Sequence, residues 1–232
     1  MPLSVEDIDS KNLFNMGRWQ LYNLEWENAL KSFSSAIELD ATFALAYAFR
    51  ARTNDFLGNQ GDNRDDLDIA VSMSLNASDD EAAMINTVAN DMKNGTSTFI
   101  VLSEALSDKY SDDSFLAFET VFATISDRGA DLVLDRAKAL YSMNPGFTPV
   151  LNMMGYAYME KGDFDNAGKK FQEQIRRASG SANPYDSMGD YYYNIGNKVD
   201  ALKYFEQSAS MGLKASAAKV DSLKAELDKD NE

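Results

Sequence analysis

Apolar residues recur along this chain with the spacing of an α-helix. In residues 151–158, apolar or small side chains stand at positions i, i+3, i+4 and i+7, which form one face of a helix. The letters EKGD then interrupt the pattern, and a second stripe of this kind covers residues 164–175. The pattern therefore predicts two helices joined by a tight turn.

This two-helix pattern returns at a fixed distance along the chain. Residues 152–174 and 186–208 share Met-Gly, Tyr, Gly, Ala, Lys and Phe at positions 34 residues apart. Residues 15–40 carry a fair third copy, and the segments between are related to it mainly by their period. A fixed period of this length is typical of repeat proteins, in which each unit packs only on its neighbours.

The period divides the chain into six units and two flanking segments. We predict a lead-in at 1–9, units at about 10–43, 44–78, 79–113, 114–147, 148–181 and 182–212, and a final helix at 213–232. Val220, Leu223 and Leu227 share one face of that final helix, so we expect it to cap the last repeat. Ser78-Asp79-Asp80-Glu81 has the form of a capping box and predicts a helix start.

Small residues are predicted where two helices of one unit cross. Gly155 and Ala167 stand on the facing stripes of the fifth unit, where a larger side chain would hold the helices apart. Tyr158 and Phe171 are expected to fill the space between units. The fifth unit is thus predicted to pack its two helices closely.

Composition limits the classes of partner. The formal net charge is −15, which disfavours nucleic acid and anionic membrane surfaces as partners. Solubility is the simplest interpretation of this charge, and a surface that steers a partner is the alternative. No apolar run reaches the ~20 residues of a membrane helix, so no membrane insertion is expected.

The residues needed for most chemistry are missing. The chain contains no cysteine and no histidine, which removes thiol chemistry and the commonest general base. No phosphate loop or nucleophile elbow occurs. The acid-rich residues 61–68 lack the glycine and the closing glutamate of a calcium loop, and we expect them to form a solvated connection into the next helix. We predict no enzymatic activity, no metal and no cofactor.

The spacing of Gly, Tyr, Gly, Ala and Phe in units 148–181 and 182–212 resembles the tetratricopeptide repeat, and Pro145 stands at an end-of-unit position. The order of strong and divergent units is similar to that of bacterial tetratricopeptide proteins, most of which have no assigned activity. This resemblance implies an all-α fold: a right-handed α-solenoid of helix-turn-helix units with a C-terminal capping helix.

The resemblance also implies a class of function. Such proteins are scaffolds that bind a protein or peptide in a concave groove lined by the first helix, helix A, of each unit. Two alternatives stay open: a self-associating structural scaffold, which would form a homo-oligomer, and the repeat portion of a larger sensor or transport-linked system. The sequence does not decide between the bacterial cytoplasm and export after removal of a leader.

Two arginines are the sharpest feature of the predicted groove. Arg18 and Arg52 occupy equivalent places on neighbouring helices A, whose axes are expected to lie roughly 10 Å apart. Two guanidinium groups on one wall are suited to hold a carboxylate or phosphate, so a partner with an acidic group is expected. The alternative is that each pairs with a local acid, such as Glu25 or Asp55.

Aromatic residues are expected to follow the arginines along the groove and to bury an apolar part of the ligand. The predicted aromatic ligand contacts are Phe115, Phe118, Phe122, Tyr156 and Tyr193. The alternative is that such residues pack between repeats. Asp186 and Asp190 give the far end an acidic character, so the lining is predicted to run from basic through aromatic to acidic.

Overall fold

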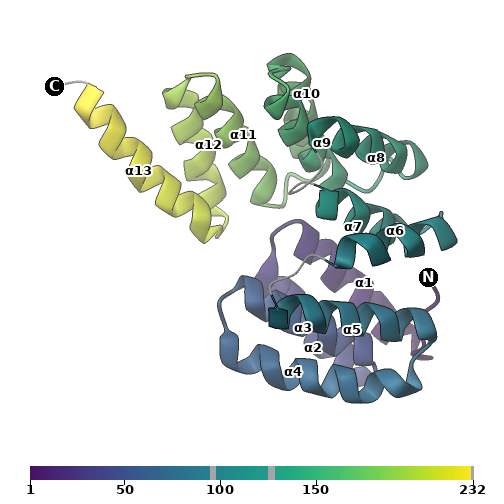
Figure 1. Cartoon of the computed structure of the whole chain (residues 1–232). Coiled ribbons are helices and arrows are strands. Elements are labelled where there is room, and N and C mark those ends of the chain that lie inside the picture. The colour runs from purple at the N-terminus through teal and green to yellow at the C-terminus, as the bar shows by residue number, and fades with distance from the viewer. Residues whose placement is uncertain (95–97, 125–128, 231–232) are drawn as a thin grey trace. The chain divides into compact units, whose positions relative to one another are not determined.

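A computed structural model describes residues 1–94, 98–124 and 129–230 (Figure 1). Within these ranges the chain is helical and has no strand, which confirms the predicted all-α fold. No helix in the same ranges is long and apolar enough to cross a membrane. The helices are α1 (Ile8–Tyr22), α2 (Trp26–Leu39), α3 (Ala44–Phe56), α4 (Gln60–Met73), η1 (Ser74–Asn76), α5 (Asp79–Asn94), α6 (Phe99–Lys109), α7 (Ser114–Thr124), α8 (Ala130–Met143), α9 (Pro149–Glu160), α10 (Phe164–Arg177), α11 (Asn183–Asn194), α12 (Lys198–Ser210) and α13 (Lys214–Asp230).

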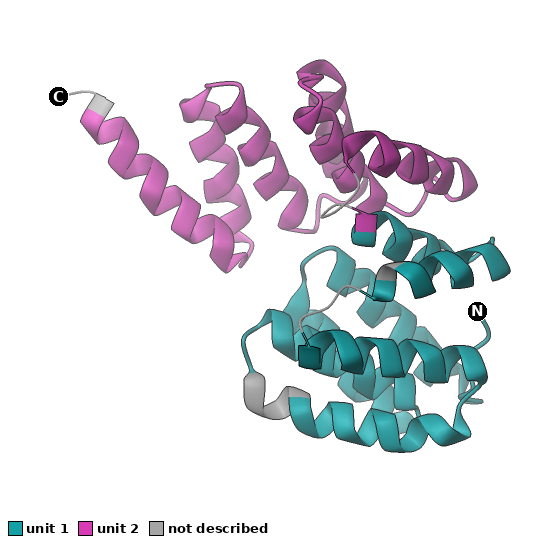
Figure 2. Cartoon of the chain, viewed as in Figure 1, with its two compact units in different colours: residues 1–123 teal, residues 124–232 magenta. Residues whose placement is uncertain are grey.

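Two compact units divide the chain, residues 1–123 and 124–232 (Figure 2). Unit 1 holds α1 to α6 and nearly all of α7, and unit 2 holds α8 to α13. The boundary falls inside the predicted fourth repeat, 114–147. The limits of the six repeats stay a prediction.

Helices α1, α9 and α11 each end in a similar turn that reverses the chain within three residues. Gly162 and Gly196 follow the ends of α9 and α11 with φ of 73° and 82°. After α9, the amide of Asp163 donates to the carbonyl of Tyr158 at 2.9 Å, which closes the helix end. Leu24 holds the equivalent place after α1 at φ 60°, the only non-glycine with positive φ in the described part of the chain. Its side chain makes that conformation less favourable than it is for glycine.

Helix crossings in three repeats depend on a glycine that faces a phenylalanine. A Cβ added at Gly17 would lie 2.5 Å from Cε1 of Phe33, and one at Gly189 would lie 2.5 Å from the ring of Phe205. Gly155 faces Phe171 in the same way. These contacts confirm the predicted close crossing of α9 and α10, because the ring of Phe171 fills the space that a side chain would need.

Helix starts give one confirmation and one correction. The amide of Glu81 donates to the Ser78 hydroxyl at 3.3 Å and the amide of Ser78 donates to the Glu81 carboxylate at 3.4 Å, which confirms the capping box. The prediction for residues 61–68 was wrong, since they lie inside α4 rather than in a connection before it. Polar and charged residues are compatible with an exposed helix face, so acidity alone did not separate the two structures.

The final helix packs as predicted. Val220 and Leu223 of α13 are buried against Ala201 and Phe205 of α12, and Leu227 packs at the edge of the same cluster. The remaining positions of α13 are mostly exposed or partly exposed. This helix therefore covers the apolar face that the last repeat leaves open.

Candidate interaction surface

In unit 1, a later helix of the same chain covers the helix-A surface of the first two repeats. Phe118 of α7 packs on Tyr22 of α1 with ring centroids 4.7 Å apart. The Tyr22 phenol donates a hydrogen bond to the carboxylate of Glu119. Arg52 of α3 donates two hydrogen bonds to the same carboxylate, at 2.8 Å and 3.3 Å. These contacts place one face of α7 against both α1 and α3.

Glu119 is a buried charge held by two donors. Glu119 is 1% exposed, and a carboxylate buried to this extent is tolerated only when it is paired and hydrogen-bonded. Burial lowers the pKa of the Arg52 guanidinium, but the neighbouring groups, Glu119 first among them, together more than offset this and the pKa is raised. Burial and then Glu119 raise the pKa of the Tyr22 phenol well above its ordinary value. At neutral pH the cluster therefore contains a charged arginine and a protonated phenol that donates.

Arg18 is buried beside this cluster without a direct counter-ion. Its guanidinium carbon lies 3.9 Å from the ring centre of Phe115 and 4.8 Å from that of Phe14, so the group is stacked between two aromatic rings. One Nη donates to Asn15, and Nε has no hydrogen-bond partner. Among the described residues Arg18 forms no ion pair. Burial lowers its pKa, and the charges of nearby groups offset this only in part.

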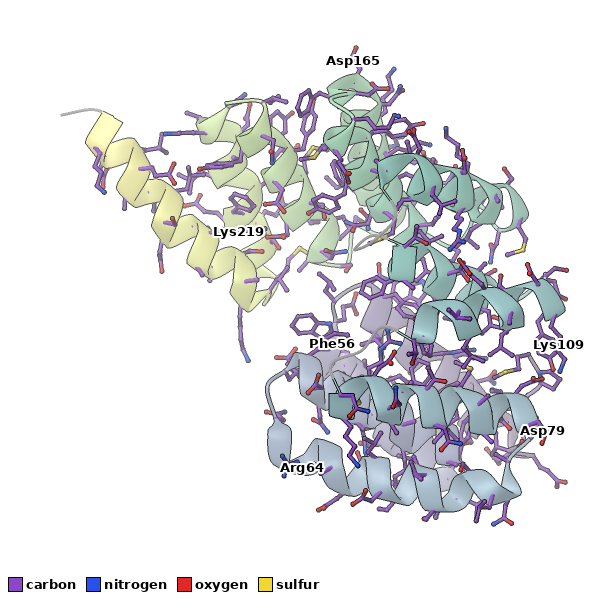
Figure 3. All side chains as sticks on the ribbon, viewed as in Figure 1. Phe56, Arg64, Asp79, Lys109, Asp165 and Lys219 are labelled. Atoms are coloured by element: carbon purple, nitrogen blue, oxygen red, sulfur yellow. The ribbon has the colours of Figure 1, made fainter. Side chains whose placement is uncertain are left out.

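A second polar cluster lies in unit 2, around the two aspartates predicted to form the acidic end of the lining. Lys219 of α13, labelled in Figure 3, donates to Asp186 at 2.9 Å and to Asp190 at 2.7 Å. The Tyr156 phenol donates to Asp190 at 2.7 Å, and the Ser216 hydroxyl donates to Asp186 at 2.6 Å. Burial and then Asp190 raise the pKa of Tyr156 well above its ordinary value. The two carboxylates are therefore already partnered by the capping helix.

Four of the sequence-predicted residues come together in unit 1. Arg18, Arg52, Phe115 and Phe118 all belong to the α1–α3–α7 contact. The predicted order along the groove was wrong here, since Phe115 lies on Arg18 instead of farther along. The local acids Glu25 and Asp55 were the expected alternative partners, whereas Arg52 pairs with Glu119 from another helix. The reason is that α7, the first helix of the fourth predicted repeat, packs across α1 and α3.

The other predicted residues differ in how far solvent reaches them. Phe122 at the end of α7 is 38% exposed, and Tyr193 at the end of α11 is 44% exposed, with its phenol near Glu226. Tyr156 is partly buried, and its ring packs edge-on against Phe171 at 5.2 Å. Ligand binding by any of the seven residues stays a prediction.

Tyr22, Glu119 and Lys219 were not predicted from the sequence. Glu119 had a visible signal, because it is the one charged residue in the apolar stretch SFLAFETVFAT. Tyr22 lies one helical turn after Arg18 and so belongs to the same lining. Lys219 sits among many other charged residues of α13 and carried no distinguishing pattern. In the described ranges, no group of three acidic side chains is placed to hold a metal ion.

Comparisons with known proteins agree with this architecture. The family model described as "Tetratricopeptide repeat" matches residues 148–179, within the predicted fifth unit. No curated protein matched the chain by sequence.

Solved structures match over nearly the whole chain. A tetratricopeptide repeat protein from Parabacteroides merdae is 16% identical with a TM-score of 0.60, covering 94% of this chain and 84% of its own. A thermophilic TPR protein of Thermus thermophilus is 16% identical with a TM-score of 0.53, covering 93% and 99%. PilW, described as a widely conserved type IV pilus biogenesis factor, is 17% identical with a TM-score of 0.53, covering 92% and 99%.

At these identities the structural matches speak for the fold alone. The helices of several repeats cross where a glycine faces a phenylalanine, and glycines follow the ends of their first helices. The chain therefore has the fold of tetratricopeptide-repeat proteins, and one repeat, at residues 148–179, matches that family by sequence.

Proposed function

We propose that this chain is a scaffold that binds a segment of a partner protein on the helix-A surface of its repeats. The tetratricopeptide fold supports a protein-interaction role in general. The observation that carries the narrower proposal is the α1–α3 surface, which holds α7 by aromatic packing and a charge-assisted hydrogen-bond pair. A surface that holds one helix in this way has the chemistry to hold another.

The seven predicted residues take different roles in this proposal. Phe122 and Tyr193 are exposed and contact a ligand directly. Arg52 and Arg18 attract an acidic group, while Phe115 and Phe118 shape the apolar part of the surface. Tyr156 positions Asp190, to which it is hydrogen-bonded. Arg18, Arg52 and Phe118 are mostly buried, so a ligand reaches them only when α7 leaves α1 and α3.

The proposal includes no catalytic role. Proteins of this repeat family are generally non-catalytic scaffolds. In this chain, the strongly shifted groups Tyr22 and Tyr156 are each hydrogen-bonded to a carboxylate and have raised pKa values, so they remain protonated at neutral pH. A protonated phenol that already donates to a carboxylate is a poor general base.

Selection of peptides tests the proposed function. A peptide display library is panned on the immobilised full chain, and enriched peptides are resynthesised and measured by fluorescence polarisation. We expect a shared peptide pattern whose binding weakens with Phe122→Ala or Tyr193→Ala. Leu75→Ala is the matched control, since Leu75 is 89% exposed and belongs to neither cluster.

The outcomes of this selection are distinct. Enriched peptides that bind both aromatic variants as tightly as the wild type would refute the assigned residues. Failure to enrich any peptide, together with concentration-dependent mass in light scattering, would replace the recruiter with a self-associating scaffold.

A further inference from the structure

Helix α7 carries two stripes on opposite sides, and Phe118 and Glu119 in the first stripe are buried. Phe115, Phe118, Glu119 and Phe122 follow the spacing i, i+3, i+4 and i+7, and the first three contact α1 or α3. The opposite stripe contains Leu116, Thr120 and Thr124, which are also buried. The packing of α7 in the fold therefore does not rest on its contact with α1 and α3 alone.

The contact between α7 and the two helices A is electrostatically incomplete. Helices α1 and α3 present two guanidinium groups to α7, those of Arg18 and Arg52. Through Glu119, α7 forms hydrogen bonds to Arg52 only. Arg18 is 5% exposed, forms no ion pair among the described residues, and leaves Nε without a partner. A buried charge that lacks a direct counter-ion is unfavourable, so a helix that supplied a second carboxylate at Arg18 would fit this surface better than α7 does.

One acidic residue beside α7 lies near Arg18, but its carboxylate already accepts other hydrogen bonds. Asp113 precedes α7, and its carboxylate accepts hydrogen bonds from the amides of Phe115 and Leu116 at 3.0 Å and 3.2 Å. Its charge acts on Arg18 from a distance, without a direct bond. Asp113 is thus engaged at the helix start, and its carboxylate also forms an ion pair with the N-terminal amine of Met1 at 2.6 Å.

We propose that the α1–α3 surface, defined by Arg18, Tyr22 and Arg52, is an acceptor for an amphipathic helix of a partner protein, and that α7 is its resident occupant. The proposal rests on the proposed function and names the chemistry of its ligand. The partner helix carries two aromatic residues three positions apart, as Phe115 and Phe118 are, with a carboxylate directly after the second. A further carboxylate, one that is not engaged at the helix start as Asp113 is, pairs with Arg18. Binding parts α7 from α1 and α3 along one stripe while its opposite stripe stays packed.

A labelled copy of the resident helix tests this acceptor. The probe is a fluorescein-labelled peptide of residues 111–124, SDDSFLAFETVFAT, titrated with the full chain and followed by fluorescence polarisation. Phe115→Ala and Glu119→Gln weaken the resident helix and leave the acceptor residues unchanged. Because apparent affinity scales with the fraction of open acceptor, we expect each variant to bind the probe at least about tenfold more tightly than the wild type.

Matched variants separate this mechanism from general loosening. Arg52→Gln combined with Glu119→Gln removes the charge pair from both sides, so it opens the same contact without the Arg52 cation that would pair with the probe's equivalent of Glu119. We expect it to lose the gain seen with Glu119→Gln alone. A probe in which the residue equivalent to Glu119 is Gln should lose the same gain. Circular dichroism checks that each variant is folded. If Glu119→Gln does not fold, Phe115→Ala takes its place as the variant with a weakened resident helix.

Four results would overturn the inference. One is equal probe affinity for Glu119→Gln and for the double variant. Another is a dimer of Glu119→Gln in sedimentation velocity without any probe, which would make a second copy of the chain the occupant. Peptides selected on the wild type that bind regardless of the Arg52 substitution would refute this site and leave the proposed function intact. If neither selected peptides nor the probe bind any variant, both proposals fail.

Discussion

Gly17→Ala tests the helix crossing on which the first repeat depends. The added Cβ would lie 2.5 Å, 2.7 Å and 2.9 Å from three carbons of the Phe33 ring. Non-bonded carbons prefer about 3.5–4.0 Å, so the closest approach is too short by about 1 Å. Phe33 is fully buried and packs against Phe14 and Phe49 with ring centroids 5.7 Å and 6.0 Å apart. The ring therefore has no free space into which it can turn.

The expected loss follows from two opposing effects. Overpacking in a filled core destabilises by about 1–3 kcal/mol, and a ring confined on several sides favours the upper half of that range. Alanine in place of glycine inside a helix returns about 1 kcal/mol. We expect the free energy of unfolding of unit 1 to fall by about 1–2 kcal/mol.

The two tryptophans allow this loss to be measured in unit 1. Trp19 lies in α1 and Trp26 in α2, so urea unfolding followed by tryptophan fluorescence reports on the repeat that contains Gly17. Asn28→Ala at an exposed position of α2 is the control and should leave the midpoint unchanged or slightly higher. A Gly17→Ala midpoint equal to that of the wild type, with an unchanged slope, would show that Phe33 is free to move and would refute the crossing argument.

Three further predictions concern single side chains. Leu24→Gly replaces a residue in the left-handed conformation by glycine, which the later repeats have at this turn. We expect the stability measured by urea unfolding with tryptophan fluorescence to rise by about 0.5–1 kcal/mol. An unchanged midpoint would mean that Leu24 gains as much from packing as it loses in conformation. Lys219→Met leaves Asp186 and Asp190 without their cation and should lower the stability measured by circular dichroism by about 1–3 kcal/mol, whereas Lys224→Met, which removes an exposed pair with Glu206, should leave it nearly unchanged. Burial and neighbouring carboxylates raise the pKa of Tyr22 and Tyr156, so their contribution to stability is present below about pH 10, where the unfolded phenol is also protonated, and is lost as pH rises toward the folded pKa. Tyr22→Phe and Tyr156→Phe should therefore each flatten the fall of the urea midpoint between about pH 9 and pH 11, and parallel curves would contradict the assignment.

The sequence by itself determined the helices and the packing within repeats. The 34-residue period, the facing stripes of the fifth unit and the apolar face of the final helix all predicted contacts that the structure contains. These features were readable because they involve residues within one repeat or in adjacent repeats. Spacing along a helix fixes which side chains share a face, and short turns leave the next helix few places to pack. The error at 61–68 arose where an acidic sequence fitted either a helix or a connection.

Only the tertiary structure decided what each groove-lining residue touches. Arg18 and Arg52 were identified as neighbours, but their contacts with Phe115 and Glu119 join residues far apart in sequence. The position of α7 on α1 depends on the small rotation added by each intervening repeat, which no local pattern specifies. Lys219 likewise neutralises Asp186 and Asp190 only because α13 packs beside α11 and α12. The sequence thus predicted which residues share a face of a helix, and the packing of other helices, α7 and α13, decided what those residues contact.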